Sequence, residues 1–251
     1  MNAKQPEHID RILEDWPFDP KAVMVRRVTG GDGREVLQMR IEMGVLQLET
    51  AGRPDGTTPF GASSVYDHLL EQALQEGLFE LTPELCVEID REFVQYYHRR
   101  VCWLRLHEYR RAVEDADHTL GLMDFCREYS DDEDWVLAHE QYRPFVLFHR
   151  TQAAALAALE QDGPEAAIIE VNAGLDRLRQ FFEQYEIDVD ESFESDELVA
   201  RLIEVRESLR ETFEIGLTLE EQLAEAVAKE QYERAAELRD ELARRQLGPG
   251  R

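Results

Sequence analysis

The chain has 251 residues, with 54 acidic and 28 basic side chains, and its formal net charge is −26 at pH 7. Apolar residues make up 43 % of it, which is ample material for a folded core. The charge balance excludes an ordinary electrostatic nucleic-acid binder, since phosphate contacts need clustered Lys and Arg, and it disfavours an anionic membrane surface. No apolar stretch is long enough for a membrane span, and the first seven residues hold no apolar signal segment.

Three cysteines, Cys86, Cys102 and Cys126, are present, and no pair has CxxC spacing. This pattern disfavours a disulfide framework or a structural zinc site, because both usually require more cysteines at closer spacing. We expect three thiols on helices, mostly buried as small apolar groups, in a cytoplasmic protein.

The N-terminal segment, residues 1–62, is predicted to contain a short helix and a β element. Apolar residues between 9 and 16 have helical spacing, and residues 23–28 are typical of a strand. Residues 35–50 alternate apolar and polar, a period of two that predicts a strand with one buried face, and so a β-hairpin. Residues 52–56 form a turn. The alternative for the alternating stretch is a helix that uses Val36, Met39, Met43 and Leu46.

From Ser63 onward the pattern is helical, so the predicted fold class is mainly α. Ser64 and Thr82 are candidate N-caps, and Pro83 suits the first helical position. An acidic loop is expected at 131–134 and a turn between helices at 161–164. The predicted domains are a helical bundle over 63–185, an exposed acidic linker over 186–197, a connecting helix over 198–216 that Gly216 ends, and a helical hairpin over 217–247.

The middle of the chain resembles tetratricopeptide repeats. Trp103, Tyr109 and Ala112 match the bulky, aromatic and small positions around the turn of such a repeat, and Ala167 lies in a second instance. The two alanines are 55 positions apart against a 34-residue period, so the acidic loop at 131–134 would be an insertion. The alternative is a plain antiparallel bundle with Ala-rich contacts. Either arrangement leaves a surface for a partner peptide.

The C-terminal hairpin begins with a capping box, in which Thr218 caps the helix and Glu221 reaches back. One apolar stripe follows, is interrupted at residues 229–231, and continues on a second helix. Because helices this short are marginal alone, we expect the stripe to be covered by another surface. The alternative to a separate partner is that the hairpin caps the chain's own helical array.

The string from Tyr232 to Leu242, YERAAELRDEL, resembles the UVR motif of the bacterial excision-repair proteins UvrB and UvrC. The motif also occurs in some Clp ATPases and their adaptors, and Tyr232 replaces its usual Phe. Together with residues 32–40, it makes the chain similar to uncharacterised bacterial UvrB/UvrC-motif-containing proteins. The resemblance implies a hairpin for protein–protein association that often self-pairs, with Arg239 and Asp240 orienting the partner. The candidate protein-binding residues are Leu219, Leu223, Val227, Tyr232, Ala235, Ala236, Leu238, Arg239, Asp240 and Leu242.

Motifs for catalysis are not found in the sequence: GxxxxGK[ST], HExxH and GxSxG are all missing. No two of the seven histidines have the i, i+3 or i, i+4 spacing of metal ligands on a helix. We expect no catalytic residue, metal or cofactor, and no direct nucleic-acid or membrane partner. The predicted function is that of an adaptor that binds another protein, a second copy of itself, or a basic protein segment. The alternative is an accessory factor of bacterial nucleotide excision repair, recruited to a UvrB- or UvrC-like partner.

Overall fold

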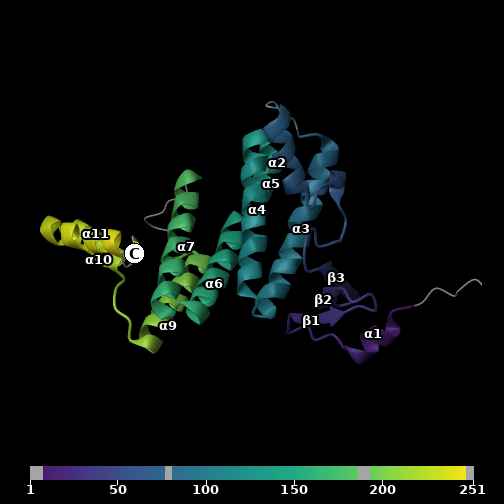
Figure 1. Cartoon of the computed structure of the whole chain (residues 1–251), viewed down its shortest axis with the longest axis horizontal. Coiled ribbons are helices and arrows are strands. Elements are labelled where there is room, and N and C mark those ends of the chain that lie inside the picture. Colours follow the sequence, from purple (N-terminus) through teal and green to yellow (C-terminus); the bar gives the residue numbers. More distant parts are fainter. Residues whose placement is uncertain (1–7, 77–80, 186–192, 247–251) are drawn as a thin grey trace, which may run out of the picture. The chain divides into compact units, whose positions relative to one another are not determined.

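The computed structural model describes residues 8–76, 81–185 and 193–246, and it confirms a mainly helical fold with a small antiparallel sheet (Figure 1). Contacts between residues divide the chain into two compact units, residues 1–153 and 154–251. The division falls inside helix α6 (Arg143–Gln161), within the predicted helical bundle. No helix among the described residues is long and apolar enough to cross a membrane.

The sheet of the first unit has the strand order β1 (Met24–Thr29), β2 (Glu35–Ile41), β3 (Gly44–Glu49), and both pairings are antiparallel. The prediction of one strand over 35–50 is wrong, because a tight turn at Glu42 and Met43 divides that stretch in two. The alternative helix is excluded by the same pairing. Met43, expected on the buried face, lies in the turn and is 87 % exposed.

A short helix, α1 (Asp10–Asp15), precedes the sheet, as predicted. Its apolar neighbours Ile9 and Ile12 stay exposed. The contact to the sheet in this region is made by Trp16, whose ring lies 4.2 Å from the Arg26 guanidinium.

Two helices of the first unit start at the N-caps predicted for them, Ser64 and Thr82. Ser64 Oγ accepts a hydrogen bond from the Asp67 N–H (3.0 Å), and Thr82 Oγ1 accepts one from Leu85 (3.4 Å). These N-caps satisfy backbone donors that would otherwise lack partners. The elements are a 3₁₀ turn η1 (Pro59–Gly61), α2 (Val65–Glu76), α3 (Pro83–Arg105), α4 (Tyr109–Tyr129) and α5 (Glu133–Glu140).

The predicted acidic loop at 131–134 is in part the start of α5, which corrects the expectation. Asp132 accepts a hydrogen bond from the Trp135 N–H (3.0 Å), and Glu133 and Asp134 form the first helical turn. Carboxylates are favourable there because the helix N-terminus carries partial positive charge.

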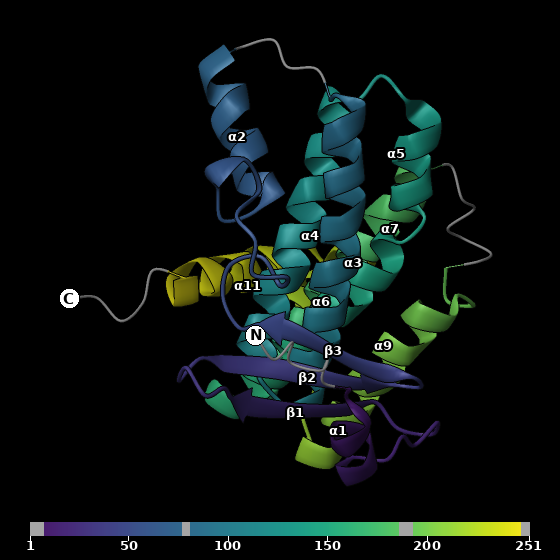
Figure 2. The same cartoon turned by 90° about the vertical axis from the view of Figure 1, so that its right-hand side faces the viewer.

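Helices α3 and α4 form an antiparallel hairpin, and the sheet lies across the end where they meet (Figure 2). Trp103 and Ala112 are buried together with Leu37 of the sheet. The hairpin covers residues 83–129, longer than a 34-residue repeat, and the tetratricopeptide assignment stays a prediction. The cysteines are free and lie on α3 and α4, with Cys102 and Cys126 buried, as expected.

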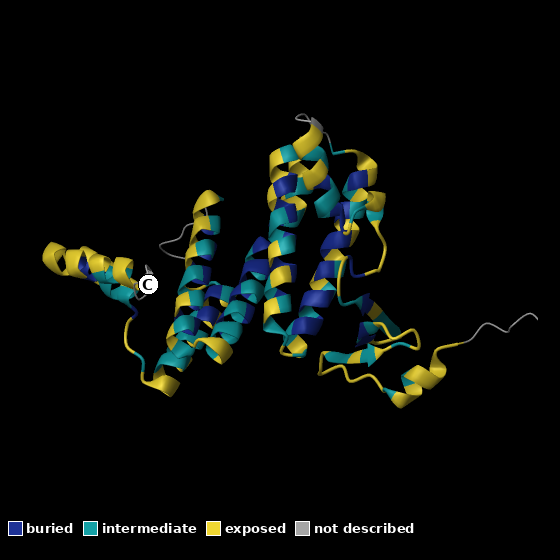
Figure 3. Ribbon diagram, in the orientation of Figure 1, coloured by how far each residue is buried: buried dark blue, intermediate teal, exposed yellow. Residues whose placement is uncertain are grey.

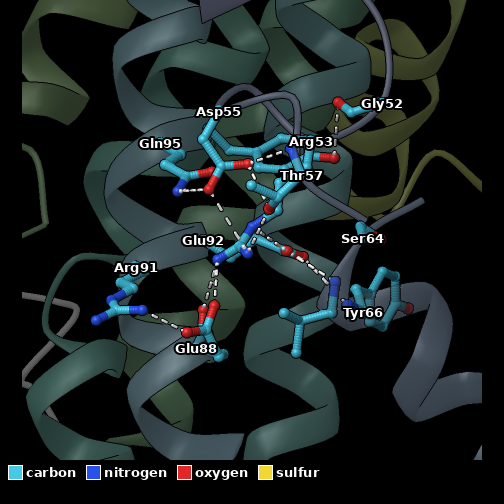
Figure 4. A network of polar contacts seen from close by, with 12 residues as sticks. Gly52, Arg53, Asp55, Thr57, Ser64, Tyr66, Glu88, Arg91, Glu92 and Gln95 are labelled. Carbon is cyan, nitrogen blue, oxygen red and sulfur yellow. Dashed lines mark hydrogen bonds and ion pairs between the residues drawn. The ribbon is translucent and has the colours of Figure 1, made fainter. Parts of the chain in front are cut away.

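A buried polar network joins the segment after β3 to helices α2 and α3 (Figure 4), and its Glu92 also contacts α4. The Arg53 guanidinium donates to Glu88 Oε2 (2.8 Å) and lies 3.3 Å from Glu92 Oε2. Glu92 is fully buried, accepts from the Val65 N–H (2.7 Å) at the start of α2, and contacts His118 Nε2 on α4 (2.9 Å). One carboxylate of α3 thereby positions this segment, α2 and α4.

Replacing Glu92 by Ala is expected to lower the free energy of unfolding by about 3 kcal/mol or more, because it leaves the buried Arg53 charge without this partner. Urea denaturation measures the change. The matched control is Glu128→Ala on the exposed side of α4, where we expect a change within about 0.5 kcal/mol. Equal effects of the two substitutions would contradict the network's role.

His149 on α6 supplies a pH test. Burial, reinforced by Arg100, lowers its pKa from 6.5 to about 4. As the pH falls, His149 therefore binds a proton in the unfolded chain before it does so in the folded chain. The free energy of unfolding consequently falls as the pH drops from 6.5 to about 4. We expect His149→Gln to lose less stability than the natural chain between about pH 7 and about pH 5. The exposed His8→Gln serves as control, and identical pH profiles for His149→Gln and the natural chain would refute the assignment.

The second unit contains part of α6, then α7 (Pro164–Gln184), α9 (Glu197–Phe213) and the C-terminal hairpin. The predicted turn at 161–164 is confirmed, with Gly163 at φ 95°. α9 ends at Phe213 because Glu214 adopts a left-handed conformation, so the helix ends before the predicted Gly216. Much of the predicted acidic linker lies outside the described residues.

The described end of that linker begins with Phe193, which is buried rather than exposed. Its ring packs edge-to-face on Phe182 of α7, with centroids 5.7 Å apart. The Arg179 guanidinium lies over the same ring, 4.3 Å from its centroid.

Candidate functional site

The C-terminal hairpin consists of α10 (Leu219–Ala228) and α11 (Tyr232–Gln246). The predicted capping box is confirmed: Thr218 Oγ1 accepts from the Glu221 N–H (3.3 Å), and Glu221 Oε2 accepts from the Thr218 N–H (2.7 Å). The interruption at residues 229–231 is the turn, where Glu230 has φ 56° and the Gln231 N–H donates to the Ala226 carbonyl (2.8 Å).

The hairpin has a very small apolar core. Ala226, Ala235 and Leu238 are buried, and Leu219 and Leu223 pack against them while half-buried. Within the described parts of the chain, this cluster contains hairpin side chains only. Figure 3 shows that most of the hairpin ribbon belongs to exposed residues.

The structure divides the predicted interface residues into an inner seam and an outer set. Ala235 and Leu238 face the hairpin's own core, so they are not open to a partner. Val227 is 52 % exposed, Tyr232 is 68 % exposed, and Ala236 is exposed. We call Val227, Tyr232 and Ala236 the outer hairpin residues.

The remaining predicted residues lie at the edges of this arrangement. Leu242 is half-buried. Arg239 and Asp240 are exposed and bond to each other, with Arg239 Nη2 2.8 Å from Asp240 Oδ1. Both keep donor or acceptor positions for a partner, since each side chain is bonded only in part.

Polar contacts tie the hairpin to the other helices of its unit. Glu221 pairs with Arg210 and lies 3.9 Å from Arg206, both on α9. Burial alone would raise the pKa of Glu221, but hydrogen bonds from the Thr218 N–H and from Arg210 lower it. A hollow of about 280 Å³ lies between α10 and helices α7 and α9, lined in part by Leu175 and Ala224. The hairpin is therefore held by charged contacts, at Glu221 on α10 and at Arg245 on α11, and a hollow remains beside α10.

Sequence reasoning missed Arg206 and Arg210 as anchors of the hairpin. Their i, i+4 spacing shortly before the acidic start of α10 is the signal that indicates them. The second contact, Arg245 to Glu165 (3.5 Å), joins residues 80 positions apart and has no local signal.

Leu238→Ala is expected to open the hairpin, because it removes the largest of three buried side chains and costs about 2–4 kcal/mol. Limited trypsin digestion reports this, since α11 contains four arginines. We expect faster cleavage in α11 than in the natural chain. Leu74→Ala on α2, where the side chain is exposed, is the control, and equally fast cleavage in both variants would contradict the assignment.

Comparison with known families gives a match over this hairpin. Residues 217–246 match the family model described as UvrB/uvrC motif. No curated protein and no solved structure matches the chain. The C-terminal hairpin is thus similar to a UvrB/uvrC motif, a motif related to protein interaction and to DNA repair.

Proposed function

We propose that this chain is a non-catalytic, cytoplasmic interaction or adaptor protein that binds another polypeptide through the outer hairpin residues. The observation that carries the proposal is the contrast between a self-contained core of three buried side chains and two large apolar side chains left in solvent. The match to a UvrB/uvrC motif supports the same interpretation.

The energetics favour a partner. Burial of a large apolar side chain contributes about 1.5–3 kcal/mol, and helices of 10 and 15 residues are marginal in isolation. Covering Val227 and Tyr232 therefore adds stability comparable to what the small core supplies. The occupant we favour is a second helical hairpin of the same kind, in another copy of this chain or in another protein.

Charge gives the partner a preferred character. The chain carries 54 acidic against 28 basic side chains, so long-range attraction favours a partner surface rich in Lys and Arg. The exposed Asp240 beside Arg239 suits a partner that presents a guanidinium, which bonds carboxylates in a fixed fork geometry.

A photo-reactive amino acid at position 232, introduced into the full chain in cells, tests the proposal. We expect a covalent adduct with one dominant polypeptide, because Tyr232 is 68 % exposed beside the hairpin core. The matched control is position 142, where Tyr142 is 58 % exposed. Equal adduct yields at the two positions would contradict the proposal.

Val227→Asp is expected to weaken association with the captured polypeptide about ten-fold or more, because a charge would enter a desolvated contact. Val94→Asp on α3 changes a valine that is 55 % exposed and is the control, with no loss expected. The dissociation constant, measured by sedimentation for a second copy or by titration for another protein, reports both. Unchanged binding by Val227→Asp would refute the assignment.

The second candidate function is an accessory role in nucleotide excision repair, favoured by the motif that residues 217–246 match. It predicts that the adduct at position 232 contains a UvrB- or UvrC-like protein. An adduct with this chain itself, or with an unrelated protein, favours the general adaptor role instead.

A further inference from the structure

The first unit contains a cavity of about 410 Å³ that the hairpin's role does not use. Its walls come from the segment after β3, from the start of α2, and from facing sides of α3 and α4. That volume lies within the range of small-molecule sites, which are concave and carry a few placed polar groups.

A buried ion pair holds one wall in place. Arg99 and Asp115 are both more than nine-tenths buried, and two guanidinium nitrogens of Arg99 contact the carboxylate at 2.9 and 2.7 Å. Arg99 Nη1 also donates to the Gly52 carbonyl (2.6 Å), which ties the segment after β3 to α3. The charges of this pair satisfy each other, so they shape the cavity and leave no charge for a ligand.

Aromatic faces form another part of the lining. Tyr96 and His118 stack in parallel, with centroids 3.7 Å apart and an interplanar angle of 1°. His118 Nε2 contacts the buried Glu92 carboxylate (2.9 Å), which fixes the position of the His118 ring. Burial raises the pKa of Tyr96, so its hydroxyl stays protonated at neutral pH. Trp103 also lines the cavity. One face of the Tyr96 ring is covered by His118 and one face of the Trp103 ring by Arg111, so the three rings form a packed aromatic wall that suits a bulky apolar group.

Three charged side chains of the lining have no oppositely charged partner among residues 8–76, 81–185 and 193–246. The Arg111 guanidinium lies over the Trp103 ring, 4.7 Å from its centroid, and its Nη1 is buried without a hydrogen bond. Among the described residues it makes no ion pair, although the chain has nearly two carboxylates for each basic side chain. Within the same described set, the carboxylates of Asp67 and Glu114 also lack an ion pair.

We propose that this cavity binds a small zwitterion of the α-amino-acid class with a bulky apolar or aromatic side chain. Arg111 receives the carboxylate, Asp67 and Glu114 receive the ammonium group, and the aromatic wall receives the side chain. Arg111 is suited to this because a guanidinium binds a carboxylate through two parallel hydrogen bonds.

The charge of the lining selects this class over a phosphate ester. The lining contains two guanidinium groups and three carboxylates, so these groups give the cavity a net charge of −1. A dianion would enter against that charge and against the −26 of the whole chain. A zwitterion brings no net charge and satisfies both signs.

Calorimetric titration of the full chain with three matched probes tests the proposal. L-Phenylalanine has both charged groups, N-acetyl-L-phenylalanine keeps only the carboxylate, and L-phenylalaninamide keeps only the ammonium group. We expect each blocked probe to bind about ten-fold or more weakly than L-phenylalanine. L-Tryptophan and L-leucine extend the series to other bulky side chains.

Variants assign the contacts. Arg111→Gln is expected to weaken L-phenylalanine binding about ten-fold or more, while Arg201→Gln, outside the cavity, leaves it unchanged. Glu114→Gln changes an exposed side chain and so is not expected to disturb folding. We expect this variant to bind L-phenylalanine more weakly and to bind N-acetyl-L-phenylalanine as the natural chain does. The proposal is overturned if none of the three amino acids binds, or if Arg111→Gln binds like the natural chain. It is also overturned if N-acetyl-L-phenylalanine binds as tightly as L-phenylalanine, which would assign the cavity to a peptide C-terminus.

Discussion

The buried carboxylate of Glu92 is the contact on which the first unit depends. It accepts the first backbone N–H groups of α2, pairs with Arg53 from the segment after β3, and contacts His118 of α4. Because a buried charge is tolerated only when it is paired and hydrogen-bonded, these four elements have to adopt their positions together. The same contacts determine the shape of the cavity in this unit, because His118 and the segment that carries Gly52 line that cavity.

The C-terminal hairpin is stabilised by local contacts and a small apolar core instead of a buried polar network. It has a capping box, a turn at Glu230 and three buried side chains, but no buried ion pair of its own and no apolar cluster shared with other described helices. It is attached through Glu221 to Arg206 and Arg210 and through Arg245 to Glu165, and a hollow remains beside α10. A module that is held by charged contacts and keeps Val227 and Tyr232 in solvent is suited to binding a separate polypeptide.

Local signals in the sequence predicted much of this fold, and non-local contacts account for what was missed. Thr82, Gly163 and Thr218 act through neighbours within a few residues, so their caps and turns could be predicted. The turn at Glu42 and Met43 was missed because apolar and polar residues continue to alternate through it. The role of Glu92 has no local signal in the sequence, since its partners lie 26 or more positions away along the chain. For the hairpin, the pattern identified the apolar residues but not which of them face the inner seam.

Hydrogen–deuterium exchange of the dilute full chain tests most directly whether the hairpin needs a partner. Local stability reports how much buried core each segment has. The account predicts that amides of α10 and α11 are protected about 100-fold less than those of α3 and α4, a difference of about 2.7 kcal/mol, and that protection rises once the captured polypeptide is added. Protection of the hairpin equal to that of α3 and α4 in the dilute chain, unchanged on addition of that polypeptide, would contradict it.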